Sequence, residues 1–412
     1  MLTSRPQILN AASSDIADLL AELSSPGALP SLEPVGDGTR SVVIFGCGHL
    51  GKFVLNGATG AGLKVLAFAD NNQKNWGQRI AGVEVMSPQE AVRRYNDEAC
   101  FVVAIYNGTA PRKQLADLNC KQIVPYPLFF WRFSEYMPFE DSLELPNRVL
   151  DDPNAIRCGY AVLSDTRSRI EFAAQIRWRC SLDYDCLPKP DPSDEMYYAP
   201  DLVSLGAEEV LVDCGAFDGD SIRMFLERTQ GRFHHIYAIE PDTKNRVELD
   251  KYLASLPCDV TRRISALPFG LSDSDEVVSF DASGTVGARV ASGAGPQSIQ
   301  CRRLDDILDD SVQPTLIKMD IEGAEPRAIL GAVETIRASR PVLAICAYHK
   351  CEHLWTLPVL IKKTLPDYEI FLRRYAEECW ETVYYAIPPE RFISRTADMS
   401  SASPTANDTS KI

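Results

Sequence analysis

The chain has 412 residues, which at about 150 residues per domain indicates two to three domains rather than one small module. Hydrophobic residues make up 45% and charged residues 24% of the chain, a globular composition that excludes a fibrous repeat and a wholly disordered protein. The net charge is −15, so the overall field repels the phosphates of nucleic acids and of anionic lipids. We therefore expect neither nucleic acid nor a membrane surface as a partner.

The cysteine pattern and the hydropathy profile indicate the compartment. None of the 12 cysteines forms a Cys-x-x-Cys pair and several lie in apolar runs, so we expect reduced thiols. The amino-terminal residues lack the basic start and apolar stretch of a signal peptide, and no apolar run approaches the roughly 20 residues that span a bilayer. These features predict a cytoplasmic protein without a membrane span, and they leave the oligomeric state open.

The first third of the chain predicts a helix, a linker and a Rossmann-like domain. Residues 1–39 combine an amphipathic stretch at 15–23 with a segment rich in proline and glycine. From residue 40 to residue 133, strand-like runs alternate with helical ones, which is typical of a parallel sheet. The expected strands are 41–45, 63–69 and 100–105, and expected helices follow Gly48 and span 88–95. An aromatic cluster at 123–133 closes this domain and is expected to lie in its core or at an interface.

The rest of the chain predicts a second α/β domain behind a connector. Residues 134–207 are polar and punctuated by proline, and they predict a helical connector with a helix at 165–179. The second domain is expected at 208–392, with strands at 210–214, 235–239, 264–267, 315–319 and 342–347 and a terminal strand pair at 368–373 and 382–387. The polar segment 393–412 predicts a disordered tail. The predicted fold class is α/β, with two Rossmann-like, doubly wound domains.

A glycine-rich loop follows the first predicted strand and precedes a predicted helix. Residues 46–51 have the pattern Gly-x-Gly-x-x-Gly, and Asp70 ends the next strand 19 residues beyond Gly51. This spacing matches the dinucleotide fingerprint, in which backbone N–H groups approach a pyrophosphate and the acidic residue accepts from a ribose. The candidate nucleotide-binding residues, for NAD or a sugar nucleotide, are Gly46, Gly48, Gly51 and Asp70. In the competing interpretation the glycines serve only the tight turn.

A second loop, residues 213–220, follows a buried strand but has the spacing Gly-x-x-x-Gly and carries three carboxylates. Together these acids would repel a pyrophosphate and attract an amine or a sulfonium. Glu240 ends the following strand, where a carboxylate can hold both hydroxyls of a ribose. A ligand that carries a positive charge and a ribose but no phosphate matches S-adenosylmethionine. The candidate cofactor-binding residues are Asp213, Gly215, Phe217, Asp218, Gly219, Asp220 and Glu240.

Two further motifs make a family resemblance specific. They are Leu-Asp-Asp-Ile-Leu at 304–308 and Leu-Ile-Lys-Met-Asp-Ile-Glu-Gly-Ala-Glu at 316–325. With the acidic loop and Glu240 they resemble the signature of FkbM-type methyltransferases, over about residues 198–387. The resemblance implies a class I methyltransferase sheet that ends in an antiparallel pair, and S-adenosylmethionine as methyl donor. It also implies O-methylation of a hydroxyl on a sugar, a glycan precursor or a complex natural product. Many members of the family have a Glu where this chain has Cys346.

The first domain has a looser resemblance of its own. Residues 43–105, with Asp-Asn-Asn at 70–72 and Gly-Val-Glu-Val at 82–85, resemble the nucleotide-sugar-binding domains of sialic-acid-type and bacillosamine-type sugar acetyltransferases. This resemblance implies a sugar nucleotide or a glycan precursor as substrate.

Strand ends in the second domain carry the candidate catalytic residues. Asp320 and Glu322 follow the strand at 315–319, and His349 follows the strand at 342–347. The carboxyl ends of parallel strands form the ligand crevice, so these side chains could take a proton from an acceptor hydroxyl. A histidine has an ordinary pKa near 6.5, which suits a base at neutral pH. Helix capping by the two acids and a structural role for the histidine are the competing interpretations.

The second domain also carries candidate metal- and anion-binding residues. Asp320 and Glu322 could hold a divalent cation through oxygen ligands. The cysteines and histidines between 346 and 353 lack the paired spacing of a structural zinc site, so no zinc is expected there. Arg373 and Arg374 could meet an anionic substrate or lie on a solvated strand.

Three functions follow from these motifs. The first is an S-adenosylmethionine-dependent methyltransferase acting on a small molecule or a glycan. The second is a nucleotide-sugar-binding or scaffolding protein with a degenerate methyltransferase domain. The third is an NAD-dependent oxidoreductase built on residues 46–51, for which no catalytic residues are identifiable. The acidic loop and Glu240 favour the first.

Overall fold

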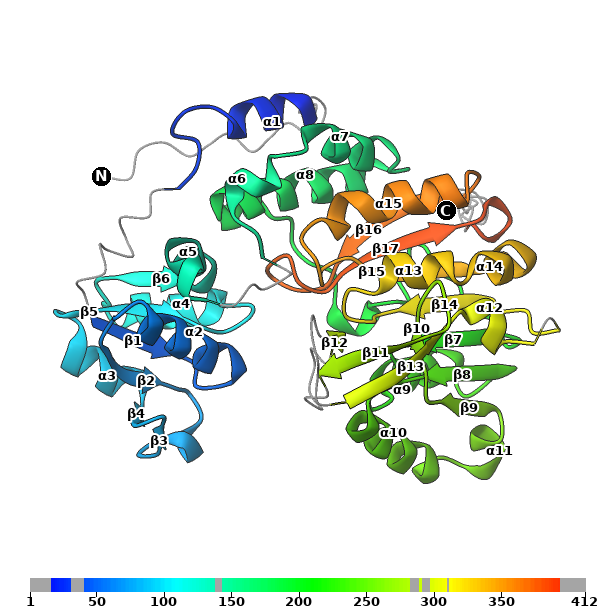
Figure 1. The fold of residues 1–412 in the computed structure, drawn as a ribbon, viewed down its shortest axis with the longest axis horizontal. Helices are drawn as coiled ribbons and strands as arrows, with labels where there is room; N and C mark the ends of the chain where they lie inside the picture. Colours follow the sequence, from blue (N-terminus) through cyan, green and yellow to red (C-terminus); the bar gives the residue numbers. More distant parts are fainter. Residues whose placement is uncertain are drawn as a thin grey trace, which may run out of the picture.

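The structure is a computed structural model that describes residues 16–30, 41–137, 143–281, 289–290, 297–309 and 311–392. The predicted tail at 393–412 and most of the predicted linker lie outside the described residues. Figure 1 shows two α/β units, the first in blue and cyan and the second in green to red. The α/β fold class predicted from the alternating strand and helix patterns is confirmed.

The first unit contains a six-stranded sheet whose order is β3-β4-β2-β1-β5-β6. Its strands are β1 (Ser41–Phe45), β2 (Val65–Ala69), β3 (Arg79–Ile80), β4 (Val83–Met86), β5 (Ala99–Val103) and β6 (Ile123–Pro125). All its strand pairs are parallel except β3 with β4. Its helices are α2 (His49–Gly60), α3 (Pro88–Tyr95), α4 (Thr109–Asp117) and α5 (Tyr126–Phe133).

Strand β1 explains why this sheet is covered on both faces. Val42 and Ile44 point into one apolar core, whereas Val43 and Phe45 point into another. A continuous apolar run in a parallel strand therefore fills two cores at once. The predicted aromatic cluster lies in the first of these cores, where all of its large rings are buried.

The second unit contains a seven-stranded sheet whose order is β16-β17-β15-β14-β7-β8-β9. Its strands are β7 (Val210–Cys214), β8 (His235–Ile239), β9 (Ile264–Leu267), β14 (Leu316–Met319), β15 (Val342–Cys346), β16 (Glu369–Arg374) and β17 (Thr382–Ile387). Strand β17 runs antiparallel to both of its neighbours, as the predicted terminal pair requires, and the other pairs are parallel. The amino end of β17 therefore lies beside the carboxyl ends of the parallel strands.

Helices and a small sheet connect these strands. The helices are α9 (Asp220–Thr229), α10 (Thr243–Ser255), α11 (Cys258–Thr261), α12 (Leu304–Ile307), α13 (Glu325–Leu330), α14 (Val333–Ser339) and α15 (His353–Thr364). The small sheet has the order β10-β13-β11-β12 and was not predicted from the sequence. Its strands are β10 (Gly270–Leu271), β11 (Glu276–Asp281), β12 (Arg289–Val290) and β13 (Gln297–Arg302).

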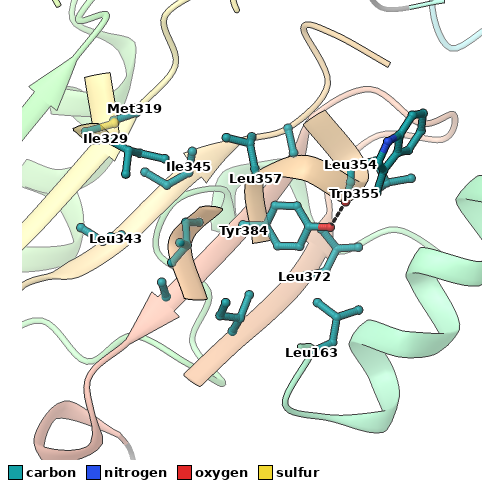
Figure 2. Packing of buried hydrophobic residues seen from close by; sticks show 14 of the residues in the cluster. Leu163, Met319, Ile329, Leu343, Ile345, Leu354, Trp355, Leu357, Leu372 and Tyr384 are labelled. Atoms are coloured by element: carbon teal, nitrogen blue, oxygen red, sulfur yellow. Dashed lines mark hydrogen bonds between the residues drawn. The ribbon is translucent and has the colours of Figure 1, made fainter. Parts of the chain in front are cut away.

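The amino-terminal helix and the connector share a core with the second sheet. Helix α1 (Ile16–Leu23) packs on α7 (Pro153–Ala161) and α8 (Thr166–Ser181), beside the short helix α6 (Pro146–Val149). The buried leucines and isoleucine of α1 belong to the same cluster as Leu343, Leu372 and Tyr384 of the sheet. Figure 2 shows part of this cluster, around Leu343, Leu372 and Tyr384, with the Tyr384 hydroxyl donating to the Leu354 carbonyl of α15. Apolar residues of the predicted connector thus help to cover one face of the sheet.

All 12 cysteines lie within the described residues and are free, which agrees with the expected reduced thiols. Across the described ranges, no helix is both long and apolar enough to cross a bilayer.

Candidate functional site

A cavity of about 290 Å³ opens at the carboxyl edge of the second sheet. Its walls come from the residues that follow β7, β8, β14 and β15, from the amino end of β17, and from the small sheet. The predicted site residues that line it are Gly215, Phe217, Asp220, Glu240, Asp320 and Glu322. Three separate strand ends therefore bring six predicted residues together, as the crevice rule for parallel sheets anticipates.

Glycine is required in the loop between β7 and α9. Gly215 has φ +81°, and a Cβ atom there would lie 1.9 Å from the carbonyl oxygen of Asp320. Gly219 has φ +89°, and its Cβ would lie 2.5 Å from the Tyr252 ring. Both positions need a left-handed backbone and a close approach, which glycine alone permits without strain.

A buried ion pair lies beneath this loop. Asp213 and Lys318 are register partners on β7 and β14, and their Oδ1 and Nζ atoms are 2.9 Å apart. Lys318 Nζ also donates to the carbonyl of Gly215 at 2.5 Å, and Ser221 Oγ donates to Asp213 Oδ2 at 2.5 Å. Asp213 has no exposed surface. Its contacts are internal and hold the loop, which differs from the direct cofactor contact predicted for it.

The three carboxylates of the loop therefore have different partners. Asp218 forms an ion pair with Arg223 at 2.7 Å and does not line the cavity. Asp220 does line it, and its Oδ1 accepts the backbone N–H of Ser221 at 2.7 Å. Burial raises the pKa of Asp220 although the side chain faces the cavity. Asp220 is thus the loop carboxylate placed to meet a cationic ligand.

Glu240 is held at the end of β8 by three donors. Its Oε2 accepts the N–H of Phe217 at 2.9 Å, and its Oε1 accepts the N–H of Asp242 at 2.8 Å and the amide of Asn245 at 3.4 Å. Burial raises the pKa of Glu240 to about 7, against these hydrogen bonds, which lower it. The carboxylate lines the cavity and retains lone pairs for the hydroxyls of a ligand.

Asp320 and His349 belong to a chain of buried charges. The Nε2 atom of His349 lies 3.0 Å from Asp320 Oδ1 and 3.6 Å from Glu322 Oε2, and its Nδ1 atom lies 2.7 Å from Glu325 Oε1. Tyr197 donates to Asp320 Oδ2 at 2.7 Å. His353 Nδ1 lies 3.3 Å from Glu325 Oε2. The chain therefore places one imidazole between two carboxylates.

These contacts decide the protonation of the cluster. Burial alone would lower the pKa of His349, but Glu325 and Asp320 raise it well above its usual value. Burial would raise the pKa of Asp320 and of Glu325, but His349 outweighs it and holds both below the usual range. His349 is therefore an imidazolium at neutral pH. The expectation of a neutral imidazole base is wrong, because the sequence does not show which carboxylates surround this histidine.

The competing capping interpretation is also not seen. Helix α13 has no side-chain cap, and Glu325 in its first turn accepts the N–H groups of Ile321 at 3.1 Å and Gly323 at 3.4 Å. Asp320 and Glu322 face the cavity instead. Glu322 does so with φ +55°, in the left-handed region that non-glycine residues rarely adopt.

Strained backbone gathers around the cavity. Tyr197, Phe217, Glu322 and Glu381 all have positive φ, and all four line it. Such conformations cost about 1–3 kcal/mol each and persist where the surrounding structure holds them, often at functional sites.

Sequence reasoning missed several polar residues of this cavity, among them Tyr197, Lys318, Tyr348 and Glu381. Lys318 carried a signal, because a lysine within a buried strand needs a partner and Asp213 occupies the matching place in another buried strand. Glu381 carried none, because its arrival depends on the antiparallel path of β17. Cys346, where many FkbM-type proteins have Glu, is a buried thiol 4.0 Å from the Tyr197 hydroxyl.

The two arginines that were considered for binding an anionic substrate form ion pairs within the protein instead. Arg373 pairs with Asp165 and Asp201, both at 2.9 Å, and Arg374 pairs with Glu171 at 2.6 Å. Both arginines are buried, so they are not placed to meet a substrate.

In the described part of the chain, no group of three or more His, Cys, Asp or Glu side chains is placed to hold a metal ion. The divalent cation considered for Asp320 and Glu322 therefore gains no support.

The first glycine loop is tightly built. A Cβ on Gly51 would lie 1.9 Å from the Gly46 carbonyl oxygen, whereas nothing lies within 4 Å of one on Gly48. Asp70 accepts the N–H of Cys47 at 3.0 Å and that of Asn72 at 2.7 Å. The turn thus requires Gly46 and Gly51 for packing, and Asp70 already uses one of the loop N–H groups that a pyrophosphate would need. Nucleotide binding here stays a prediction.

Comparison with known proteins agrees with the motifs of the second unit. Residues 213–375 match the family model described as the methyltransferase FkbM domain. A crystal structure of methyltransferase FkbM from Methylobacillus flagellatus KT superposes with a TM-score of 0.73 and 23% identity, covering 90% of this chain and 98% of that one. The family model thus agrees with the resemblance noted in the sequence over residues 213–375, and the superposition shows the same fold over most of the chain. No curated protein matches the sequence significantly.

Other solved structures match a smaller share of this chain. A precorrin-6y C5,15-methyltransferase from Geobacter metallireducens GS-15 has a TM-score of 0.29 and 13% identity, over 45% of this chain and 82% of that one. A putative methyltransferase from Streptococcus mutans in complex with SAH has a TM-score of 0.30 and 10% identity, over 48% of this chain and 99% of that one. Likenesses this weak do not bear on the activity of the present chain.

Proposed function

We propose that the cavity binds S-adenosylmethionine and that the protein transfers its methyl group to a hydroxyl of a small molecule, a sugar or a glycan precursor. The observation that carries this proposal is the convergence of Asp220 and Glu240 on one cavity beside a glycine loop. The match of residues 213–375 to a methyltransferase domain supports it. The intact acidic pair favours an active enzyme over a scaffold with a degenerate domain.

The donor set fits this cosubstrate. Glu240 presents a carboxylate to the cavity at a strand end, where it would accept the hydroxyls of the ribose. Asp220 would lie toward the positive charge of the sulfonium or of the amino group. When bound, S-adenosylmethionine supplies an electrophilic methyl carbon. The chain contributes by orienting the acceptor oxygen toward that carbon and by taking its proton.

The predicted roles of the Asp320 cluster are revised within this proposal. Asp320 is half-buried and contacts Tyr197 and His349, and its pKa is held below the usual range, so it is a weak base. Asp320 is better suited to hold the side chains of Tyr197 and His349 in place at the cavity wall. Asp320 and Glu322, with His349 behind them, would orient the acceptor and stabilise positive charge nearby, rather than accept its proton.

The direct test is calorimetry with S-adenosylmethionine and S-adenosylhomocysteine. We expect Glu240→Gln to weaken binding of both about 10- to 100-fold, because hydrogen bonds to a charged acceptor are worth about 1.5–3 kcal/mol. Glu248→Gln is the matched control, since Glu248 is exposed on α10 and pairs with Lys251. Undetectable binding to folded wild-type protein at millimolar ligand would overturn the proposal, as would equal affinities of wild type and Glu240→Gln.

The pH dependence of binding should follow Glu240. Ribose hydroxyls donate to the charged carboxylate, so binding lowers the pKa of Glu240 from about 7 and releases a proton. The affinity for S-adenosylhomocysteine should therefore fall as the pH drops from 8 to 6, by up to about tenfold per unit below the pKa. Glu240→Gln should flatten this profile. A wild-type affinity that is constant over this range would show that Glu240 does not accept the ligand's hydroxyls.

A further inference from the structure

The turn between β16 and β17 joins the cavity to the first domain. Glu381 stands immediately before β17 and lines the cavity. Its backbone is fixed on both sides, because its carbonyl accepts the N–H of Tyr375 at 2.9 Å and the carbonyl of Thr382 accepts the N–H of Ala347 at 2.9 Å. The antiparallel path of β17 thus delivers a carboxylate to the edge where the parallel strands end.

The first domain contacts the same turn from outside. Glu378 is 4% exposed and accepts hydrogen bonds from Gly108 N, Arg112 Nη1 and Trp380 Nε1, each at 3.1 Å. The Trp380 ring packs edge-on against Tyr106, with ring centroids 5.1 Å apart. Tyr106, Gly108 and Arg112 belong to the β5–α4 segment of the first domain. This segment, here called the clamp, therefore binds two residues of the turn that carries Glu381.

The backbone of the turn is held in an unfavourable conformation. Glu381 has φ +49°, and Asn107 of the clamp, whose side chain accepts the N–H of Glu378 at 3.4 Å, has φ +58°. A left-handed conformation at a glutamate persists only where its surroundings enforce it. The hydrogen bonds of the clamp to Glu378 and the pairing of β17 with β15 hold this conformation from two sides.

The surroundings of Glu381 suit a proton acceptor at neutral pH. Burial first, and then Asp320, Asp220 and Glu322, raise the pKa of Glu381 to about 7, while His349 lowers it. Three further titratable groups, on other segments than the turn of Glu381, interact electrostatically with its carboxylate: Tyr197, Cys346 and Tyr348. Burial raises the pKa of each of them, so they stay neutral and compete for no proton at neutral pH.

We infer that Glu381 accepts the proton of the acceptor hydroxyl, and that the clamp of the first domain positions it by holding Glu378 and Trp380. The inference rests on the proposed methyl transfer. As the acceptor oxygen forms its bond to the methyl carbon, the bond from that carbon to sulfur breaks and its electron pair stays on sulfur, which leaves S-adenosylhomocysteine. The hydroxyl proton moves to a carboxylate oxygen of Glu381 and passes from there to water.

A titration of the full-length protein tests the placement without a known acceptor. Carbon-13 NMR of protein labelled at glutamate carboxyls, compared with Glu381→Gln to assign the signal, should show Glu381 titrating near pH 7. Arg112→Ala should shift that midpoint toward the usual 4.5, because a loosened turn admits water. Glu378→Gln should shift it in the same direction and serves if Arg112→Ala does not fold. Arg93→Ala, an exposed arginine paired with Glu90 in the same domain, should leave it unchanged.

Turnover adds the chemical test. With a panel of methyl glycosides and sugar nucleotides as acceptor probes, Glu381→Gln should lower kcat about 100-fold or more while the affinity for S-adenosylhomocysteine stays within about twofold. In Glu381→Gln, the pH profile of kcat should no longer show the rise near pH 7 that the ionisation of Glu381 causes in wild type. A Glu381 midpoint near 4.5 in wild type, a midpoint insensitive to both clamp variants, or full turnover in Glu381→Gln would each overturn the inference. Failure of wild type to bind S-adenosylmethionine would instead overturn the proposed function, whatever the titration shows.

Discussion

Replacing Lys318 with methionine is expected to lower the free energy of unfolding by about 3–5 kcal/mol, because it leaves the carboxylate of Asp213 buried without a counter-charge. Lys318 is 2% exposed and lies among Asp213, Asp220 and Asp320. Burial would lower the pKa of Lys318, but these three carboxylates raise it above its usual range, so Lys318 is an ammonium at neutral pH. Urea denaturation followed by circular dichroism measures the loss.

The double variant Asp213→Asn/Lys318→Met separates charge from packing. It should recover much of the stability that Lys318→Met loses, because removing both charges also removes the unpaired carboxylate. Lys251→Met is the matched control, since Lys251 is exposed and pairs with Glu248 on α10, and it should change stability by less than about 0.5 kcal/mol. A Lys318→Met protein within 1 kcal/mol of wild type would contradict the buried pair.

His349→Ala is expected to cost a similar amount, about 3–5 kcal/mol, because it removes the cation between Glu325 and Asp320. Glu325 has no exposed surface, so its buried carboxylate would lose its partner at 2.7 Å and keep His353 at 3.3 Å. A histidine that acted only as a catalytic base would change turnover and leave stability nearly unaltered. Thermal or urea unfolding of His349→Ala, beside binding of S-adenosylhomocysteine, distinguishes the two roles.

The pH dependence of stability gives an independent reading of the same residue. The folded-state pKa of His349 lies above its unfolded value, so the folded protein binds one more proton between them. Its contribution is complete below about pH 6.5 and is lost as the pH rises toward the folded pKa. Above pH 6.5, wild-type stability should fall as the pH rises, with a slope of at most about 1.4 kcal/mol per pH unit from this residue, and His349→Ala should lack this contribution. His234→Ala, at an exposed histidine, is the control and should keep the slope. A parallel slope in His349→Ala would show that His349 is neutral.

Local patterns in the sequence predicted the elements that frame the cavity. The runs at 41–45, 210–214, 235–239 and 264–267 coincide with β1, β7, β8 and β9. For β1 and β7 the reason is that a buried parallel strand is apolar on both faces, so its limits are visible in the chain. The six predicted residues that meet at the cavity do so because strand ends in such a sheet converge. That convergence follows from the topology and needs no side-chain detail.

The partners of the charged residues depended on the tertiary structure. Asp213 and Asp220 stand in the same acidic loop, yet one pairs with Lys318 from a neighbouring strand and the other faces the cavity. His349 becomes an imidazolium because Asp320, after β14, and Glu325, in α13, place carboxylates on both sides of its ring. Each outcome depends on distances of about 3 Å between segments far apart in the chain, and electrostatic energies in a buried site change steeply over such distances.

The sequence by itself determined the two α/β units and the strand ends at which polar residues gather, because these follow from the periodicity of apolar residues. It also determined the glycine turns, because their backbone conformation requires glycine. The folded chain alone decided which of those residues face the cavity with a free carboxylate and which are paired inside the protein. It also brought in Glu381, through an antiparallel strand and a turn contacted by the first domain. The physical reason is that burial and neighbouring charges set the protonation of a side chain, and both arise only when distant segments pack together.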